Sequence, residues 1–438
     1  MSLPENWAEH PLVEVIDFQE GPGILAKDFR PAGISLIRLS GLERGASVLD
    51  GCNFLDPSMV ERRWSHFPVQ EGDVLLSASA CLGRIAVVDS QSAGGIPYTG
   101  IIRMRPRVAS LDRAFLRYLL ESTHFQRQVE AMGAGSVLRH FGPMHLRAMT
   151  VILPPLSEQR AITHILGALD DKVELNRRTN ETLEAIAQAV FKSWFVDFDP
   201  VRAKMAGRQP FGMDAATAAL FPDSFEDSPL WAIPARWEVG TIGALGEVIC
   251  GKTPPTAEPR NYGGDTPFIT IPDMHGRVFV THTATTLSEA GTQTQPKKWL
   301  PALAVCVSCI ATPGLSVLTS VPSHTNQQIN AIVCRRGVSP FWCLLQVRSM
   351  RGEIVTGGAG GSATLNLNKG NFAAMPVLIP TEKCMGAFHV SVKPVFDHIL
   401  LNEFQSQSLG SIRDTLMPKL LSGQVRVKDA EKLIGDAV

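Results

Sequence analysis

Features that mark membrane-spanning, strongly charged or exported proteins are missing from this sequence of 438 residues. The longest nearly continuous apolar run, Ala302–Ala311, has ten residues, whereas a helix needs about 20 to cross a bilayer. Lysine and arginine number 41 against 42 acidic residues, a net charge of −1, so no global charge points to a nucleic acid or a membrane surface. The first thirty residues include Glu5, Glu9, Glu14 and Asp17 and do not resemble a signal peptide.

Cysteine is also scarce. Eight cysteines are scattered over the whole chain, which predicts a reduced, cytoplasmic protein rather than a disulfide scaffold. Apolar residues make up 45% and charged residues 19% of the sequence, as in globular proteins. At roughly 150 residues per domain, the length predicts about three domain-sized units.

The sequence repeats itself. With a shift of 226 residues, Val151 falls on Val377, Leu175-Asn176 on Leu401-Asn402, and Leu183 on Leu409. Upstream the shift drifts to 230–235, as loop insertions would make it, and places Arg62-Arg63-Trp64 on Lys297-Lys298-Trp299. Collinear matches of this kind predict a tandem duplication.

Each half begins with a strand-rich part. Short β-rich apolar runs separated by Gly, Pro and Asn turns predict these strands: 33–39, 73–77 and 150–153 in the first half, and 267–271, 304–310 and 376–379 in the second.

Each half ends in a long helix with a heptad pattern. Ten a/d positions between Ile162 and Trp194 carry eight apolar residues, against about 4.5 expected from composition, and the same positions shifted by 226 carry seven. Two separate amphipathic helices in separate cores are the alternative to a paired seam. Pro394 should kink the second helix or mark its start. The predicted seam consists of Leu169, Val173, Asn176, Leu183, Val395, Ile399, Asn402 and Leu409.

The expected fold is α+β: two mixed α/β heads separated by two long antiparallel coiled-coil-like helices, related by a pseudo-twofold internal duplication. Head 1 is assigned to residues 1–155 and head 2 to 236–381. The first helix lies in 156–198, and the second helix with a C-terminal tail in 382–438. Residues 199–235, rich in Pro, Ala and Asp, are expected to form a linker that Phe211, Phe221 and Trp231 hold down.

Two motifs suggest nucleotide or metal binding, but the residues around each of them argue against that function. Gly246–Thr253 matches a phosphate-binding loop, but Pro254 and Pro255 follow at once and prevent the helix that such a loop requires. Cys306 and Cys309 have zinc-knuckle spacing but lie in an apolar strand with no second pair, which favours a core position. We therefore expect a non-catalytic binding protein with no metal site.

Local charge is more informative than the total. Residues 103–147 carry a net charge of +5 and residues 236–381 a net charge of +4. This pattern suits a protein that grips a polyanion at two places, although an ordinary solvated surface would give the same excess.

Several segments resemble the specificity subunits of type I restriction–modification systems. Residues 154–162 (PPLSEQRAI), 169–176 (LDDKVELN) and 193–198 (SWFVDF) resemble the first central helix of that family. Residues 416–425 (LMPKLLSGQV) resemble the end of its second helix, and GKTP at 251–254 with GDTPFI at 264–269 resembles the opening of a target-recognition domain. The chain departs from the pattern at 381–387 (TEKCMGA), so the start of the second helix stays open.

The resemblance implies a non-catalytic DNA-recognition subunit without a cofactor of its own. Each head would be a target-recognition domain that reads half of a bipartite site in double-stranded DNA, and the helices would set the spacing. Two methyltransferase subunits using S-adenosylmethionine would dock on the chain, with ATP- and Mg²⁺-dependent restriction subunits joining through them. A two-headed protein-binding scaffold and a nucleotide-driven enzyme built on Gly246–Thr253 are the alternatives.

Candidate site residues follow from this interpretation, each against the alternative of an ordinary surface side chain. We expect phosphate contacts from Arg62, Arg63, Lys297 and Lys298. Groove contacts are expected from Lys252, Arg139, His140 and Lys369. Contacts to adenine edges are expected from Asn326, Gln327 and Gln328. A methyltransferase-binding surface, or else packing on the linker and a head, is expected for Phe191, Trp194, Phe195 and Phe198.

Overall fold

The computed structural model describes residues 4–43, 47–133, 141–228, 232–358 and 367–430. The chain forms two compact units, each with a core of its own: unit 1 comprises residues 1–171 and 409–438, and unit 2 comprises residues 172–408. Within the described residues, no helix is both long and apolar enough to cross a membrane.

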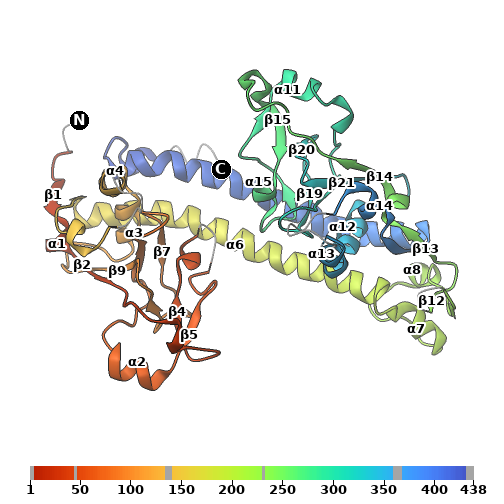
Figure 1. The fold of residues 1–438 in the computed structure, drawn as a ribbon, viewed down its shortest axis with the longest axis horizontal. Coiled ribbons are helices and arrows are strands. Elements are labelled where there is room, and N and C mark those ends of the chain that lie inside the picture. Colours follow the sequence, from red (N-terminus) through yellow and green to blue (C-terminus); the bar gives the residue numbers. More distant parts are fainter. Residues whose placement is uncertain (1–3, 44–46, 134–140, 229–231, 359–366, 431–438) are drawn as a thin grey trace. The chain divides into compact units, whose positions relative to one another are not determined.

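Two long helices dominate the chain (Figure 1). Helix α6 spans Leu156–Phe195 and α15 spans Glu382–Leu421, each with 40 residues. Both ends of α15 lie 226 residues after those of α6, the same shift that relates the two halves of the sequence. Two long helices in a duplicated chain are thereby confirmed.

The second helix begins well before Pro394. Helix α15 already starts at Glu382 and continues through the proline, so the prediction that Pro394 marks its start is wrong. Proline removes one backbone donor inside a helix and leaves the carbonyl four residues earlier, that of Val390, without its partner. Both Pro394 and Val390 are exposed, so water can satisfy that carbonyl.

Unit 1 combines head 1 with the first part of α6 and the last part of α15. A four-stranded antiparallel sheet in the order β2-β9-β6-β7 and a second sheet in the order β3-β5-β4-β8 form the head. The first sheet contains β2 (Ile16–Glu20), β9 (Ile101–Pro106), β6 (Val74–Ser77) and β7 (Ile85–Val87). The second contains β3 (Phe29–Arg30), β5 (Asn53–Leu55), β4 (Ile34–Ile37) and β8 (Ile96–Pro97).

Helices and a short ribbon complete unit 1. Ile162 and Leu166 of α6 and Leu416 and Leu420 of α15 belong to the same buried cluster as Phe115 of the head. The remaining elements are β1 (Ala8–Pro11), paired antiparallel with β10 (Thr150–Leu153), and α1 (Leu12–Val15), α2 (Pro57–Arg63), α3 (Phe115–Glu121), α4 (Thr123–Gly133) and α5 (Pro143–Leu146).

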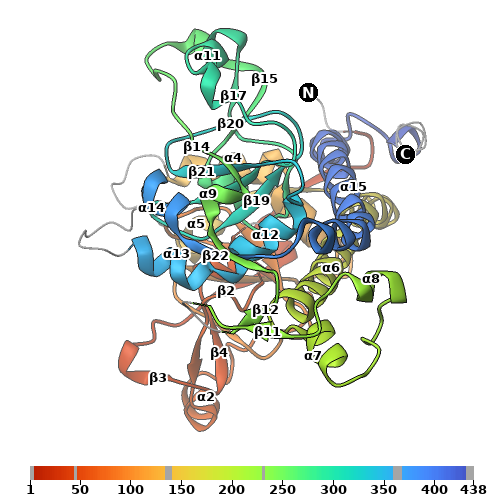
Figure 2. The same ribbon diagram turned by 90° about the vertical axis from the view of Figure 1, so that its right-hand side faces the viewer.

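Head 2, in unit 2, repeats this plan. Its five-stranded sheet has the order β14-β21-β18-β19-β16 and its three-stranded sheet the order β17-β15-β20, and Figure 2 shows α12 beside β19 of the larger sheet. The strands are β13 (Glu238–Thr241), β14 (Gly246–Cys250), β15 (Tyr262–Ile269), β16 (Phe279–Val280), β17 (Thr286–Leu287), β18 (Val305–Ser308), β19 (Ser316–Thr319), β20 (His324–Thr325), β21 (Ile329–Cys334) and β22 (Pro376–Ile379). The helices are α9 (Ile242–Leu245), α10 (Ile271–Met274), α11 (Glu289–Gln293), α12 (Pro340–Ser349), α13 (Arg351–Gly358) and α14 (Lys369–Ala374).

The motifs set aside in the sequence take up the expected places. Gly246–Cys250 is strand β14, and residues 251–258, all described, form no helix. Cys306 and Cys309 are buried, and desolvation raises the pKa of their thiols to about 12 and about 11. Both therefore remain protonated side chains of the core.

The segment between the halves is packed rather than free. It forms α7 (Asp199–Met205), α8 (Ala215–Ala219) and the strand pair β11 (Phe225–Glu226) and β12 (Ile233–Pro234). Phe221 is fully buried in the core of unit 2, whereas Phe211 is fully exposed. Of the three aromatic residues expected to hold the linker down, Phe221 does so and Phe211 does not; Trp231 lies outside the described residues.

Within unit 2 the two long helices meet in a polar layer. Asn176 Nδ2 lies 3.4 Å from the carbonyl oxygen of Asn402 and donates to Ser406 Oγ at 3.2 Å, while Asn402 Nδ2 donates to Asn180 Oδ1 at 2.9 Å. Shifting the first residue pair, 176 and 406, by 226 in opposite directions gives the second pair, 402 and 180. Asn176 and Asn402 are therefore repeat counterparts that contact each other across the helix pair of unit 2.

The other predicted seam positions are buried to different degrees. Leu169, Ile399 and Leu409 are buried, and Val173, Leu183 and Val395 are half-buried. Apolar positions on both sides of a buried asparagine layer are typical of a helix pair whose register is specified by polar contacts.

Candidate nucleic-acid interface

Two loops of head 2 bring several predicted residues side by side. The backbone N–H of Lys252 donates to the carbonyl oxygen of Thr325 at 3.0 Å, and Thr253 Oγ1 donates to Gln327 Oε1 at 2.6 Å. A Cβ atom at Gly251 would lie 2.2 Å from the carbonyl oxygen of Asn326, so only glycine permits this approach. Residues 251–253 and 325–328 therefore form one surface, from which Lys252 and Gln327 are exposed.

The three predicted amide side chains differ in availability. Asn326 is 9% exposed; its Nδ2 donates to Gln328 Oε1 at 3.1 Å, and its Oδ1 accepts from the Gln328 backbone N–H at 3.0 Å. Asn326 thus holds the turn, and Gln327 is the exposed amide at its tip. Base contacts by these residues remain a prediction.

A lysine pair and a tryptophan adjoin this surface through strand β20. Lys297 is exposed, Lys298 is half-buried, and the next residue, Trp299, is 45% exposed. The Trp299 ring meets His324 edge-on at a centroid distance of 5.3 Å. His324 is fully buried, neither ring nitrogen has a hydrogen-bond partner in the described structure, and burial lowers its pKa, so the ring is neutral at pH 7. Trp299 was not among the predicted residues, although it follows the predicted lysines as its repeat partner Trp64 follows the predicted arginines.

Lys369 occupies a different place in head 2. It is the exposed first residue of α14, capped by Asn368, and α14 packs on α9 and β14. No contact of Lys369 within the described residues brings it onto the surface formed by residues 251–253 and 325–328.

Head 1 presents its predicted arginines on a short helix. Arg62 and Arg63 form the exposed last turn of α2, where Arg62 Nε donates to the Ser58 carbonyl at 3.1 Å. The Arg63 guanidinium lies 4.9 Å from the centroid of Trp64, which is 6% exposed. Arg139 and His140, the other two candidates of head 1, lie outside the described residues.

The close loop approach of head 2 recurs in head 1. A Cβ atom at Gly21, which follows β2 as Gly251 follows β14, would lie 2.0 Å from the Pro97 carbonyl oxygen. Tyr98 then occupies the place of Asn326, and its ring receives the Arg38 guanidinium at 4.1 Å. Sequence reasoning missed Arg38 and Tyr98; aligning Tyr98 with Asn326 across the repeat would have indicated the tyrosine.

The aromatic residues at the end of α6 lie in the core of unit 2. Phe195 meets Phe388 at 5.2 Å and Phe198 meets Trp237 at 5.7 Å, while Trp194 meets Phe221 of the linker at 5.3 Å. Phe191 and Phe195 are 4% and 5% exposed. The interpretation of these two as a partner-binding surface is therefore wrong, and packing on the linker and head 2 is correct.

Comparisons with known proteins agree with this duplicated architecture. Residues 4–185 and 234–383 each match the type I restriction modification DNA specificity domain. The type I restriction enzyme HindI specificity subunit of Haemophilus influenzae is 35% identical over 401 residues, covering 82% of this chain and 87% of that protein. The MjaIX specificity subunit of Methanocaldococcus jannaschii is 23% identical over 383 residues, covering 86% and 82%.

A solved structure supports the fold. The type I restriction–modification S subunit from M. genitalium aligns with a TM-score of 0.54 at 15% identity, over 95% of this chain and 96% of that one. Taken with the family match in both halves, these similarities establish that the chain belongs to the type I restriction–modification specificity subunits.

Proposed function

We propose that this chain is the DNA-recognition subunit of a type I restriction–modification enzyme and performs no catalysis itself. Each head reads one half of a bipartite site in double-stranded DNA. The observation that carries this proposal is the specificity domain matched twice, once over each head. Methyltransferase subunits dock on the chain and transfer methyl groups from S-adenosylmethionine, and restriction subunits that use ATP and Mg²⁺ join through them.

The surface around Lys252, Gln327 and Trp299 supplies suitable chemistry for head 2. Lysine side chains neutralise phosphates, an exposed amide can pair with adenine in the major groove, and a half-exposed indole offers a stacking face. In head 1, Arg62 and Arg63 next to Trp64 supply the phosphate contacts. Sequence readout then depends on the loops that surround each cluster.

The long helices act as the spacer between half-sites. The 33 residues Ile162–Trp194 span about 50 Å at a rise of 1.5 Å per residue. Two reading elements on one face of DNA need a separation near one helical turn, about 34–36 Å, which a helix of this length can support.

Mapping of methylated adenines across the genome, with and without this gene, tests the proposal. A split motif that disappears on deletion is expected, and exchange of residues 1–155 for those of a relative should change one half of the motif only. An unchanged methylome, in cells where the chain co-purifies with active methyltransferase subunits, would contradict the proposal.

Binding to DNA duplexes separates recognition from a protein-binding scaffold. The complex should bind a duplex carrying the mapped motif more tightly than a scrambled duplex, with an affinity that falls steeply as salt rises. Equal, weak binding to both duplexes would favour the scaffold instead.

A further inference from the structure

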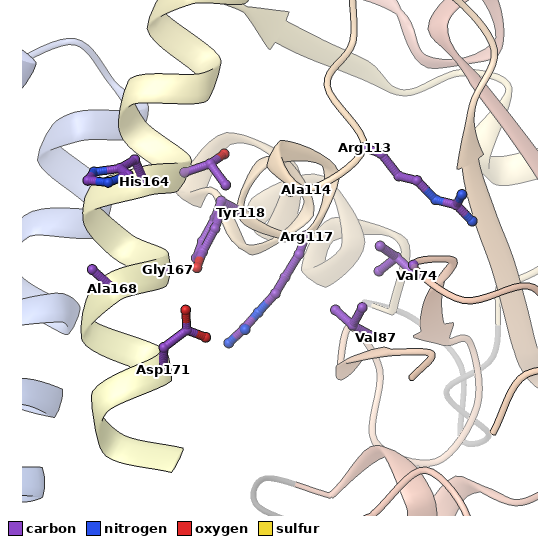
Figure 3. Close-up of a pocket in the computed structure, with 12 residues that line it drawn as sticks. Val74, Val87, Arg113, Ala114, Arg117, Tyr118, His164, Gly167, Ala168 and Asp171 are labelled. Carbon is purple, nitrogen blue, oxygen red and sulfur yellow. The ribbon is translucent and has the colours of Figure 1, made fainter. Parts of the chain in front are cut away.

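Unit 1 contains a cavity of about 590 Å³ between α3, α6 and the strands β6 and β7. Val74, Val87, Ala114 and Gly167 supply apolar walls, and Figure 3 shows Arg113 and Arg117 extending from the α3 side. A Cβ atom at Gly167 would meet nothing nearer than Tyr118 Oη at 3.8 Å. The volume falls within the range of small-molecule sites, about 300–1,000 Å³.

Internal duplication identifies the matching place in unit 2. Asp112 lies just before α3 and accepts from the Ala114 and Phe115 N–H groups, as Ser339, the N-cap of α12, accepts from Trp342. Each of the two residues also bonds the neighbouring long helix: the Asp112 N–H donates to Gln159 Oε1 at 2.8 Å, and Ser339 Oγ lies 3.0 Å from His389 Nδ1. Asp112 therefore corresponds to Ser339, and Ala114 to Phe341.

In unit 2 an aromatic ring fills this place. Phe341 stacks on His389 at 5.0 Å and on Phe396 at 4.4 Å, with interplanar angles of 17° and 6°. His389 and Phe396 are seven residues apart on α15, a rise of about 10.5 Å, so the Phe341 ring lies between them. The chain itself thus shows what fits between the head and the long helix here: a flat ring.

Unit 1 leaves the same place open. The counterparts of Phe341, His389 and Phe396 are Ala114, Thr163 and Asp170, none of them aromatic. Ala114 and Thr163 line the cavity, and Thr163 Oγ1 is buried without a hydrogen-bond partner in the described structure. The side chains that would close the cavity have been replaced by smaller ones.

One arginine of the cavity wall is available to an acidic group. Arg105 already binds both carboxylate oxygens of Asp73, at 2.7 and 2.6 Å, so the 3.3 Å contact from Arg113 to Asp73 is the longest of the three. The Arg113 side chain is 47% exposed. Arg117, in contrast, is held by Glu121 and Asp170, both at 3.2 Å.

We propose that this cavity binds a planar aromatic acid, with the ring in the place that Phe341 fills in unit 2 and the acidic group on Arg113. The ligand comes from outside the chain, and its site is separate from the DNA-reading loops. A guanidinium beside an apolar slot selects for charge as well as for flatness, because a charge-assisted hydrogen bond is about twice as strong as a neutral one.

Nuclear magnetic resonance with the full chain tests the proposal. The probes are 4-fluorobenzoate, indole-3-carboxylate and adenosine monophosphate, with 4-fluorobenzamide as the neutral match of the first. We expect at least one acid to bind, and 4-fluorobenzoate to bind about tenfold more tightly than the amide. Arg113→Gln should remove that preference. Absence of binding by every probe at millimolar concentration would overturn the proposal.

Filling the cavity supplies a second criterion. Ala114→Phe places in unit 1 the ring that unit 2 carries, and it should abolish probe binding while raising the melting temperature of the chain. Gly167→Leu fills the cavity from the helix side and serves if Ala114→Phe does not fold. Unchanged probe affinity in a folded filling variant would show that the acids bind elsewhere and would overturn the assignment.

The matched control is Phe341→Ala in unit 2. It should create a cavity in which the neutral 4-fluorobenzamide binds at least as well as the acid, because Pro340 stands in unit 2 where Arg113 stands in unit 1. A preference of the new cavity for 4-fluorobenzoate would show that Arg113 is not the source of charge selectivity.

Discussion

The same two positions of the helix pair are charged in unit 1 and apolar in unit 2. In unit 1, Arg413 Nη1 lies 2.7 Å from Asp170 Oδ1, and Tyr118 Oη of the head donates to Asp170 Oδ2 at 3.0 Å. A shift of 226 turns Asp170 into Phe396 and Arg413 into Ala187, both fully buried in the apolar core of unit 2. The duplication has kept the two helices and exchanged the chemistry at these two positions.

The two kinds of fastening have different physical consequences. An apolar core gains stability with the area it buries, largely without directional requirements. A buried carboxylate has been removed from water, so its stability depends on keeping every partner. At these positions unit 2 should therefore respond to lost volume, and unit 1 to lost charge pairing.

Removing one ring from unit 2 should have the largest effect. Phe388 is fully buried and meets Phe191, Trp194 and Phe195 at 5.2–6.2 Å. Phe388→Ala should lower the free energy of unfolding by about 3–5 kcal/mol through lost transfer energy and the cavity left behind. Denaturant unfolding measures this, with Val390→Ala, 72% exposed on the same helix, expected to change stability by less than about 0.5 kcal/mol.

Breaking the ion pair of unit 1 should have the next largest effect. Asp170 and Arg413 have side chains only 15% exposed, so Asp170→Leu should cost about 2–3 kcal/mol by leaving a nearly buried guanidinium poorly paired. The double variant Asp170→Leu/Arg413→Leu imitates the apolar pair of unit 2 and should recover more than half of that loss. Losses that simply add in a double-mutant cycle would contradict the comparison.

Stability of unit 2 should also depend on pH through one carboxyl group. Glu403 accepts from the Val278 and Phe279 backbone N–H groups at 3.0 and 3.1 Å, and burial raises its pKa to about 7 from an ordinary 4.5 despite those bonds. The folded chain then binds a proton between pH 4.5 and 7 that the unfolded chain has released. The contribution of Glu403 to stability is therefore fully present below this window and is lost as pH rises through it.

Glu403→Gln measures that contribution. The variant should make the melting temperature nearly independent of pH over 4.5–7, compared with a fall in the wild type. Glu174 provides the opposite slope in the same unit, because Arg177 holds its pKa down at about 2, so its contribution is lost as pH falls from 4.5 towards 2. A rise of wild-type stability between pH 5 and 7 would show that Glu403 is not the dominant group.

The smallest expected effect concerns salt-dependent binding to DNA. Replacing Lys297 and Lys298 with glutamine should weaken binding of the complex several-fold and reduce the salt slope by about one per lost phosphate contact. Arg62→Gln with Arg63→Gln should do the same for head 1. Lys383→Gln, at an exposed position of α15, is the control. If the control reduces the salt slope equally, the assignment of these lysine and arginine pairs to phosphate contacts is wrong.

The duplication and the two long helices could be predicted, because the repeat shift of 226 residues and the apolar heptads can be read from the sequence alone. The start of α15 could not be predicted, because Pro394 interrupts the heptad pattern. Local sequence signals cannot show that the helix face around Pro394 is open to water.

Strands expected at 73–77, 150–153 and 376–379 correspond to β6, β10 and β22. These segments are short, apolar and bounded by turn residues, which is what a sequence window can detect.

Contacts between distant segments were beyond sequence reasoning. The pairing of Asp170 with Arg413 joins residues 243 positions apart, and neither side chain differs in the sequence from a surface charge on a helix. Lys252 meets Thr325 and Thr253 meets Gln327 only because residue 251 is a glycine that lies against the Asn326 backbone, and the sequence alone does not show that neighbour. The cavity beside Ala114 could be identified only by comparing the position of Ala114 in unit 1 with that of Phe341 in unit 2.

The contact between Asn176 and Asn402 has a genetic consequence. If two identical halves were encoded separately, a single codon would specify both sides of this contact, and any change to it would be made twice at once. In one duplicated chain the two codons change independently, and the neighbouring counterparts at positions 180 and 406, asparagine and serine, already differ. A substitution at 176 therefore alters one side of the contact and leaves the other to accommodate it.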